Sequence, residues 1–249
     1  MPTIYLSPST QPYNLYATGG NEQQWMNQLA DYMEPLLTAS GINYVRKSLD
    51  MSAADAIRAV NAGNYDLSVA LHSNAAPESL AGTLQGIIVF YYPGSESGRQ
   101  AATIIADGLK EIYPHPELVR TEPTTAIGEV ARTRSPTAFL EIGYHDNIMD
   151  SQWIQANLEP LARNITASLA RYFNTSPASP PATGVPTPGR VTISWGHLNI
   201  RERPDVNAPI IATATDGTMV NILNTAGEWY LIQFGDVVGY ASTDYIESV

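Results

Sequence analysis

The residues of this chain whose types suit metal-assisted hydrolysis are one histidine and two glutamates that lie far apart in the sequence. His72 follows the apolar run Leu67–Leu71, which predicts a buried strand. Glu141 lies inside a second apolar run, Thr137–Ile142, and Glu22 stands where a polar loop gives way to a helical pattern. A hydrolytic zinc site needs about three protein ligands, an open position for water, and a carboxylate that moves the proton.

Whether His72 is functional depends on its neighbours in the fold. A histidine at a strand end is more often a structural residue that makes hydrogen bonds. In open α/β sheets, however, ligands bind at the carboxyl ends of the strands, so strand ends remote in sequence can meet at one edge. Burying a lone carboxylate such as Glu141 is costly unless it is paired or lies near a cation. Glu141 is therefore the most informative acidic residue.

The elements that must position these residues alternate between strands and helices. Alternation of this kind favours a largely parallel sheet with helices on its faces. Pro35 lies late in the first predicted helix and is expected to end or kink it. Residues 121–136, which hold Glu129, Arg132 and Arg134, show no clear helical or strand period. The predicted elements are a strand at Thr3–Leu6, a helix from Glu22 to Gly41, a strand at Ile42–Val45, a helix capped by Ser52, the strand before His72, a strand at Gly86–Tyr92, a helix through Ala101–Ile112, the strand Thr137–Ile142, and a last helix capped by Asp150.

Composition excludes several classes of protein. The chain has 249 residues and a net charge of −11, which argues against binding to a phosphate backbone and so against a nucleic-acid partner. It has no cysteine, so disulfides and thiolate metal sites are excluded. No apolar run approaches the length of a membrane span. The first residues lack a basic start and a long apolar core, so we expect no signal peptide; the protein then stays in the cytosol, leaves by another route, or is seen in mature form.

The pattern changes near residue 174. Asn174–Gly189 is rich in Pro, Ser, Thr, Ala and Gly, which is typical of a semi-extended linker. Beyond it, short β runs separated by turn signals predict a small β-barrel. We expect three parts: a catalytic domain at 1–173, a linker at 174–189, and a small binding domain at 190–249. The predicted β runs are Val191–Ser194, Leu198–Ile200, Ile210–Ala214, Met219–Asn224, Trp229–Phe234 and Val238–Ala241.

Several motifs in the first part, taken in order, resemble the zinc-dependent N-acetylmuramoyl-L-alanine amidases of the amidase-3 type. The resemblance implies a mixed, mainly parallel six-stranded sheet flanked by helices, and cleavage of the amide between N-acetylmuramic acid and L-alanine in peptidoglycan. It also implies that Glu22 and His72 are zinc ligands and that Glu141 is the general base. The motifs are IYLSPSTQ (4–11), NEQQWMNQLAD (21–31), ALHSN (70–74), GIIVFYYP (86–93) and LEIGYHDN (140–147).

One departure concerns the metal site. The family has a histidine ligand just after its first strand, where this chain has Thr10, and the following loop holds no histidine. Three interpretations remain open. In the first, a nearby group completes a weaker site, the candidates being Thr10, Gln11, Tyr13 and Asn14. In the second, His145 swings in as the missing ligand, although we favour a structural or supporting role for it. In the third, the protein binds the wall without cutting it.

The last part resembles a bacterial SH3-type domain. In that family such modules bind peptidoglycan peptides or cross-bridges, and tethering by the linker would raise the local concentration of the enzyme at the wall. Trp229 is expected to belong to the barrel core, whereas Trp195 and His197 are expected to be exposed. The motifs that carry this resemblance are LNIRERP (198–204), DGT (216–218), EWYL (228–231) and VGY (238–240).

The leading hypothesis is therefore a cell-wall amidase, an endolysin or an autolysin, that uses zinc and acts on peptidoglycan at the bacterial cell wall, either outside the cell or after release by lysis. Asn74 and Arg134 are candidates for substrate binding, and we expect a monomer. The alternatives are a catalytically degenerate wall-binding protein on the same scaffold, and another zinc peptidase that acts on wall peptides, such as a carboxypeptidase.

Overall fold

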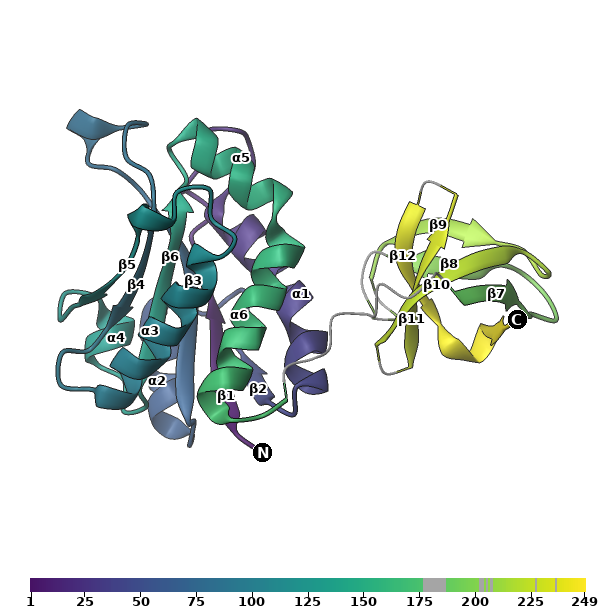
Figure 1. Cartoon of the computed structure of the whole chain (residues 1–249), viewed down its shortest axis with the longest axis horizontal. Coiled ribbons are helices and arrows are strands. Elements are labelled where there is room, and N and C mark those ends of the chain that lie inside the picture. Colours follow the sequence, from purple (N-terminus) through teal and green to yellow (C-terminus); the bar gives the residue numbers. More distant parts are fainter. Residues whose placement is uncertain (177–186, 202–203, 205, 207, 227, 236) are drawn as a thin grey trace. The chain divides into compact units, whose positions relative to one another are not determined.

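The protein consists of two compact units in a computed structural model of the whole chain, Met1–Ala178 and Ser179–Val249 (Figure 1). The structure describes residues 1–176 and 187–249 with the exception of 202, 203, 205, 207, 227 and 236. Among the helices described, none combines the length and the apolar character that crossing a bilayer requires. The two units are described separately below.

The first unit is built on a six-stranded sheet in the order β2-β1-β3-β6-β4-β5. All neighbouring strands run parallel except β4 and β6, which are antiparallel. The prediction of a mainly parallel six-stranded sheet is therefore confirmed. The strands are β1 (Thr3–Pro8), β2 (Asn43–Arg46), β3 (Leu67–Asn74), β4 (Ile87–Tyr91), β5 (Val119–Pro123) and β6 (Thr137–Tyr144).

Helices cover both faces of this sheet (Figure 1). Three of them, α1, α3 and α6, pack side by side over one face, where they bury alternate residues of the strands such as Leu6, Leu71 and Leu140. Helices α2 and α4 cover the other face, which carries Tyr5 and Phe139. The helices are α1 (Glu22–Ala39), α2 (Ala53–Ala62), α3 (Glu96–Lys110), α4 (Gly128–Ala131), α5 (Ile148–Ala156) and α6 (Leu158–Phe173).

Local sequence signals explain most of the element boundaries. Ser52 caps α2 through a capping box with Asp55, as the pattern predicts. Pro35 lies inside α1, which continues to Ala39. Asp150 does not cap the last helix, contrary to prediction: Asn147 caps α5, accepting from the N–H groups of residues 149 and 150. The prediction of one continuous last helix is also wrong, because α5 ends before Asn157 and α6 begins after it.

Asp150 instead fixes the end of β6, the strand that carries Glu141. One of its carboxylate oxygens accepts hydrogen bonds from the backbone N–H groups of Tyr144 (2.8 Å) and Gly86 (3.1 Å). The other accepts from the Tyr113 hydroxyl at 2.5 Å. Asp150 is 1% exposed, and these hydrogen bonds offset the cost of burying its carboxylate. Asp150 thus joins the carboxyl end of β6 to the start of β4.

The second unit is an antiparallel seven-stranded sheet in the order β13-β7-β10-β11-β12-β8-β9, around an apolar core. Trp195 is 88% exposed and His197 is exposed, as expected. Trp229 is partly exposed rather than buried in the core, whereas Tyr230 packs against the core. The strands are β7 (Thr187–Val191, which starts inside the segment predicted as linker), β8 (Leu198–Arg201), β9 (Ile210–Ala214), β10 (Met219–Ala226), β11 (Trp229–Phe234), β12 (Val237–Ser242) and β13 (Ile246–Ser248).

Candidate functional site

His72 and Glu141 are neighbours on adjacent parallel strands. β3 pairs with β6 so that His72 lies opposite Glu141 and Ala70 lies opposite Phe139. Side chains two residues apart on a strand point to the same face, so both groups share the face covered by α4, where Ala70 and Phe139 pack against Val130. The imidazole also stacks on the Phe139 ring, with centroids 4.4 Å apart. Strand register therefore brings the predicted histidine and the predicted base together.

Glu22 reaches the same place from the first turn of α1. Asn21 caps this helix by accepting from the Gln24 N–H at 2.9 Å, and a carboxylate in a first helical turn is favoured by the helix dipole. Glu22 is 1% exposed, and its Oε1 lies 2.8 Å from His72 Nδ1. The same oxygen accepts from the backbone N–H of Ser73 at 3.3 Å. The structure thus unites Glu22 and His72, which the sequence places fifty residues apart.

A third glutamate that sequence reasoning missed faces the other side of the histidine. Glu129 lies on α4 and is 6% exposed, with its Oε2 3.7 Å from His72 Nε2. Its Oε1 accepts a hydrogen bond from the Ser7 hydroxyl at 2.6 Å. The segment around Glu129 has no apolar period, so the sequence offered no signal for this contact. His72 is therefore flanked by one carboxylate at each ring nitrogen.

This arrangement shifts the pKa values of the buried groups in opposite directions. Burial favours the neutral imidazole, but Glu129 and Glu22 outweigh it and raise the pKa of His72 to about 9. Burial would raise the pKa of Glu22, but His72 and Asn14 hold it below its ordinary value. Burial raises the pKa of Glu141 to about 8, against an opposing effect of His72. A carboxyl group with a pKa in this range suits proton transfer near neutral pH.

The metal-free protein is expected to lose stability as the pH rises from about 6.5 to 9. The folded state holds a proton on His72 with a pKa of about 9, whereas the ordinary value is 6.5. This stabilisation is complete below the lower value and is lost as the pH passes the higher one, a change of about 3 kcal/mol. Glu141, also raised, acts in the same direction. Urea unfolding at several pH values measures the slope; a His72→Gln variant with the same slope would contradict this assignment.

Four residues near the first strand were candidates for the missing ligand, and the structure separates them. Gln11 is the one beside the histidine, because its Nε2 lies 3.2 Å from His72 Nδ1. Asn14 contacts Glu22 instead, with its Nδ2 donating to Oε2 at 2.5 Å. The Thr10 hydroxyl donates to the backbone oxygen of residue 51 at 2.9 Å, which commits it elsewhere. The Tyr13 hydroxyl donates to Oε1 of Gln11 at 3.0 Å, and its ring is exposed.

His145 lies one step behind the site. Its Nδ1 is 3.0 Å from the backbone oxygen of Ser73 and 3.2 Å from the Ser73 hydroxyl, and its ring stacks on Tyr16. Since the Ser73 N–H donates to Glu22, His145 supports the residue that binds Glu22. The supporting role of His145 stays a prediction.

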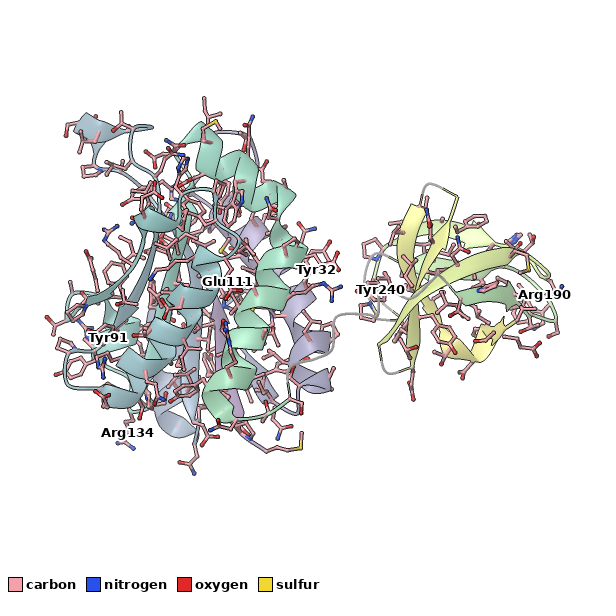
Figure 2. The ribbon with its side chains drawn as sticks, viewed as in Figure 1. Tyr32, Tyr91, Glu111, Arg134, Arg190 and Tyr240 are labelled. Atoms are coloured by element: carbon pink, nitrogen blue, oxygen red, sulfur yellow. The ribbon has the colours of Figure 1, made fainter. Side chains whose placement is uncertain are left out.

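The two candidates for substrate binding lie in different places. Asn74 is the last residue of β3, and its side-chain oxygen accepts from the N–H of Ala75 at 2.9 Å. Arg134 precedes the start of β6, near the end of the unit where the chain begins, and its side chain points away from the unit (Figure 2). The structure thus places Asn74 near His72 but does not bring Arg134 to it.

The donors around His72 meet only part of what a zinc site needs. Within the ranges that the structure describes, no three His, Asp or Glu side chains come together at metal-ligand spacing. Glu22 Oε1 and His72 Nδ1 nevertheless meet at 2.8 Å, and zinc accepts oxygen and nitrogen ligands of these types. The Gln11 amide lies beside them with its nitrogen toward His72, while its oxygen accepts from the Tyr13 hydroxyl and the Asn14 amide and would have to turn inward to serve as a third donor. Among the described residues, Glu141 Oε2 is a buried atom without a hydrogen-bond partner. The carboxylate and the imidazole are of types that zinc accepts, and a site built from these residues would have an amide in place of the usual third ligand.

Two family models match this sequence. The model of the N-acetylmuramoyl-L-alanine amidase family (Amidase_3) matches residues 10–171, and that of the bacterial SH3 domain family (SH3_3) matches residues 196–247. Comparison with curated protein sequences finds no significant match.

Solved structures share the fold of the first unit. The amidase AmiC2 of Nostoc punctiforme is 14% identical with a TM-score of 0.62, and the match covers 70% of this chain and 97% of that one. The CwlD amidase from Clostridioides difficile, solved with the GerS lipoprotein, is 16% identical with a TM-score of 0.62, covering 70% and 99%. The catalytic domain of the CD27L endolysin, which targets Clostridia difficile, is 19% identical with a TM-score of 0.57, covering 69% and 98%. The chain therefore belongs to the N-acetylmuramoyl-L-alanine amidase family and carries a bacterial SH3 domain after its amidase domain.

Proposed function

We propose that this protein is a zinc-dependent amidase that cleaves the bond between N-acetylmuramic acid and L-alanine in peptidoglycan. The observation that carries the proposal is the buried pair of Glu22 and His72. On the central strands β3 and β6, His72 lies opposite Glu141. The same three residues are those that the family resemblance marks as two ligands and a base. Gln11, from the position next to Thr10, supplies the third donor.

The residues divide the work of amide hydrolysis between them. Glu22 and His72 would hold the ion, and Asn14 and the Ser73 N–H orient the Glu22 carboxylate. When bound, zinc lowers the pKa of a water and polarises the scissile carbonyl. Glu141 takes the proton from the attacking water and delivers it to the amine of L-alanine as the bond breaks.

We further propose that the SH3 domain attaches the enzyme to the cell wall. Trp195 supports this role because a tryptophan that is 88% exposed offers a flat apolar surface to a ligand. Binding by a tethered module raises the concentration of the enzyme at its substrate without any new contact in the active site. The wall is then both the substrate and the partner of this protein.

Product analysis tests the proposed activity. The purified protein, incubated with peptidoglycan and zinc, is expected to release peptides whose new amino terminus is L-alanine, together with muramic acid that carries a free lactyl carboxylate. Dansylation of the new amino groups and mass spectrometry of the fragments identify the bond that was cut. The Glu141→Gln protein, treated in the same way, is the matched control.

Other products would support the competing functions. A new amino group on a residue other than L-alanine would indicate a zinc peptidase acting on wall peptides. No release from any wall type, together with sedimentation of the protein on walls, would indicate a degenerate amidase that only binds. The second outcome has one observation in its favour, namely that Thr10 stands where the family has a ligand histidine.

A further inference from the structure

Both ring nitrogens of His72 face carboxylates, but only one of these carboxylates belongs to the proposed metal site. Glu22 lies at Nδ1, at 2.8 Å, and Glu129 lies at Nε2, at 3.7 Å. His72 Nε2 is buried and makes no hydrogen bond within the part of the chain that the structure describes. A single ion at Nδ1 cannot also be held at Nε2, which lies on the opposite side of the ring. Glu129 therefore needs a role of its own.

The chain holds Glu129 in this place through several contacts. Its Oε1 accepts from Ser7, a residue of β1 that lies 122 positions away in the sequence. Val130, the next residue, packs into the apolar cluster with Ala70 and Phe139. The positive charge of Lys47, which is 3% exposed, favours the ionised form of the carboxylate. Because a buried carboxylate is costly, these partners explain how a charge is kept beside His72.

We propose that Glu129 is a positioning residue that holds the proton of His72 on Nε2 and so keeps Nδ1 directed at Glu22 and a bound ion. The inference rests on the proposed zinc function for its consequence, but not for its geometry. Histidine ligands of metals generally donate their second ring N–H to a carboxylate or a carbonyl, which fixes the tautomer and the ring orientation. Glu129 Oε2 lies 3.7 Å from that nitrogen, so a small shift of the side chain makes it the acceptor. The Phe139 ring, which stacks on the imidazole, restricts rotation of the imidazole.

Two variants and a matched control test this role in the full-length protein. Glu129→Ala removes the acceptor, whereas Glu129→Gln keeps an acceptor oxygen and removes the charge. Glu117→Ala is the control, because Glu117 Oε1 lies 3.6 Å from His115 Nδ1 in a similar but exposed pair. Zinc affinity, measured by competition with a chromophoric chelator, is expected to fall about 10–100-fold in Glu129→Ala. It is expected to fall less in Glu129→Gln and to stay unchanged in Glu117→Ala.

A measurement without zinc separates this inference from the proposed function. In ¹⁵N spectra of the metal-free protein at pH 10, above the pKa of His72, the imidazole carries a single proton, and Nε2 is expected to be the protonated nitrogen. In Glu129→Ala that resonance is expected to move to the position of an unprotonated nitrogen, and in Glu117→Ala it is expected to stay. If the wild-type protein binds no zinc but the Glu129→Ala variant shows this change in its spectrum, the zinc function is refuted and the role of Glu129 is supported. Unchanged spectra and unchanged zinc affinity in a folded Glu129→Ala protein would overturn the inference.

Discussion

Replacing Glu141 with glutamine is expected to reduce turnover of peptidoglycan by about 100-fold to 10,000-fold, the range that a positioned general base contributes. Glutamine keeps the size and shape of the side chain but cannot accept the proton of the attacking water. Glu22 and His72 remain in place, so zinc content is expected to stay the same. Binding to cell walls is expected to stay the same as well, because the SH3 domain does not contain the altered residue. Release of new amino groups, measured over time, gives the rate.

A matched replacement on the neighbouring part of the sheet controls for the loss of a glutamate. Glu122 lies on β5, pairs with Arg120, and has a side chain that is 43% exposed. Glu122→Gln is expected to retain the wild-type rate. If Glu141→Gln hydrolysed peptidoglycan at the wild-type rate, Glu141 would have no part in the mechanism. A loss of both turnover and zinc in Glu141→Gln would assign it to the metal site instead.

The sequence was sufficient for the elements that form continuous apolar runs, such as the strands buried on both faces, or apolar helical faces. The first three strands and the two helices between them follow their apolar patterns, as do β4 and β6. β5 was missed because it is a polar edge strand with a single buried residue, Val119. Helix α4 was missed because four residues are too few to show a helical period. The predicted strand ended before His72, whereas β3 continues through His72 to Asn74.

The candidate site could be predicted only as far as backbone topology determines it. Strand register brings His72 to Glu141, and the start of α1 brings Glu22 to the same edge, so these three residues follow from the order of the elements. The contact of Glu129 with His72 depends on a short helix in a segment without a period, and no pattern in the sequence indicates it. The choice among Gln11, Thr10 and their neighbours depends on side-chain directions that only the folded loop defines.

Replacing His72 with alanine is expected to remove bound zinc, whereas replacing His145 is expected to leave most of it. His72 supplies a ligand nitrogen in the proposed site, so its loss is expected to weaken zinc binding by more than the 10–100-fold that the loss of a supporting residue causes. His145 acts only through Ser73, whose N–H is one of the contacts that hold Glu22. Its loss is expected to weaken zinc binding by about tenfold, at the low end of that range.

Elemental analysis after dialysis against a low concentration of free zinc measures both effects in the same experiment. His115→Ala is the matched control, because His115 is exposed and pairs only with Glu117 among the ion pairs described. Equal loss of zinc from the His72 and His145 variants would make His145 a ligand, and the imidazole would then have to leave its stack on Tyr16 to reach the ion. Full retention of zinc by His72→Ala would place the ion elsewhere, because Glu22 and the Gln11 amide are too few donors to hold it alone.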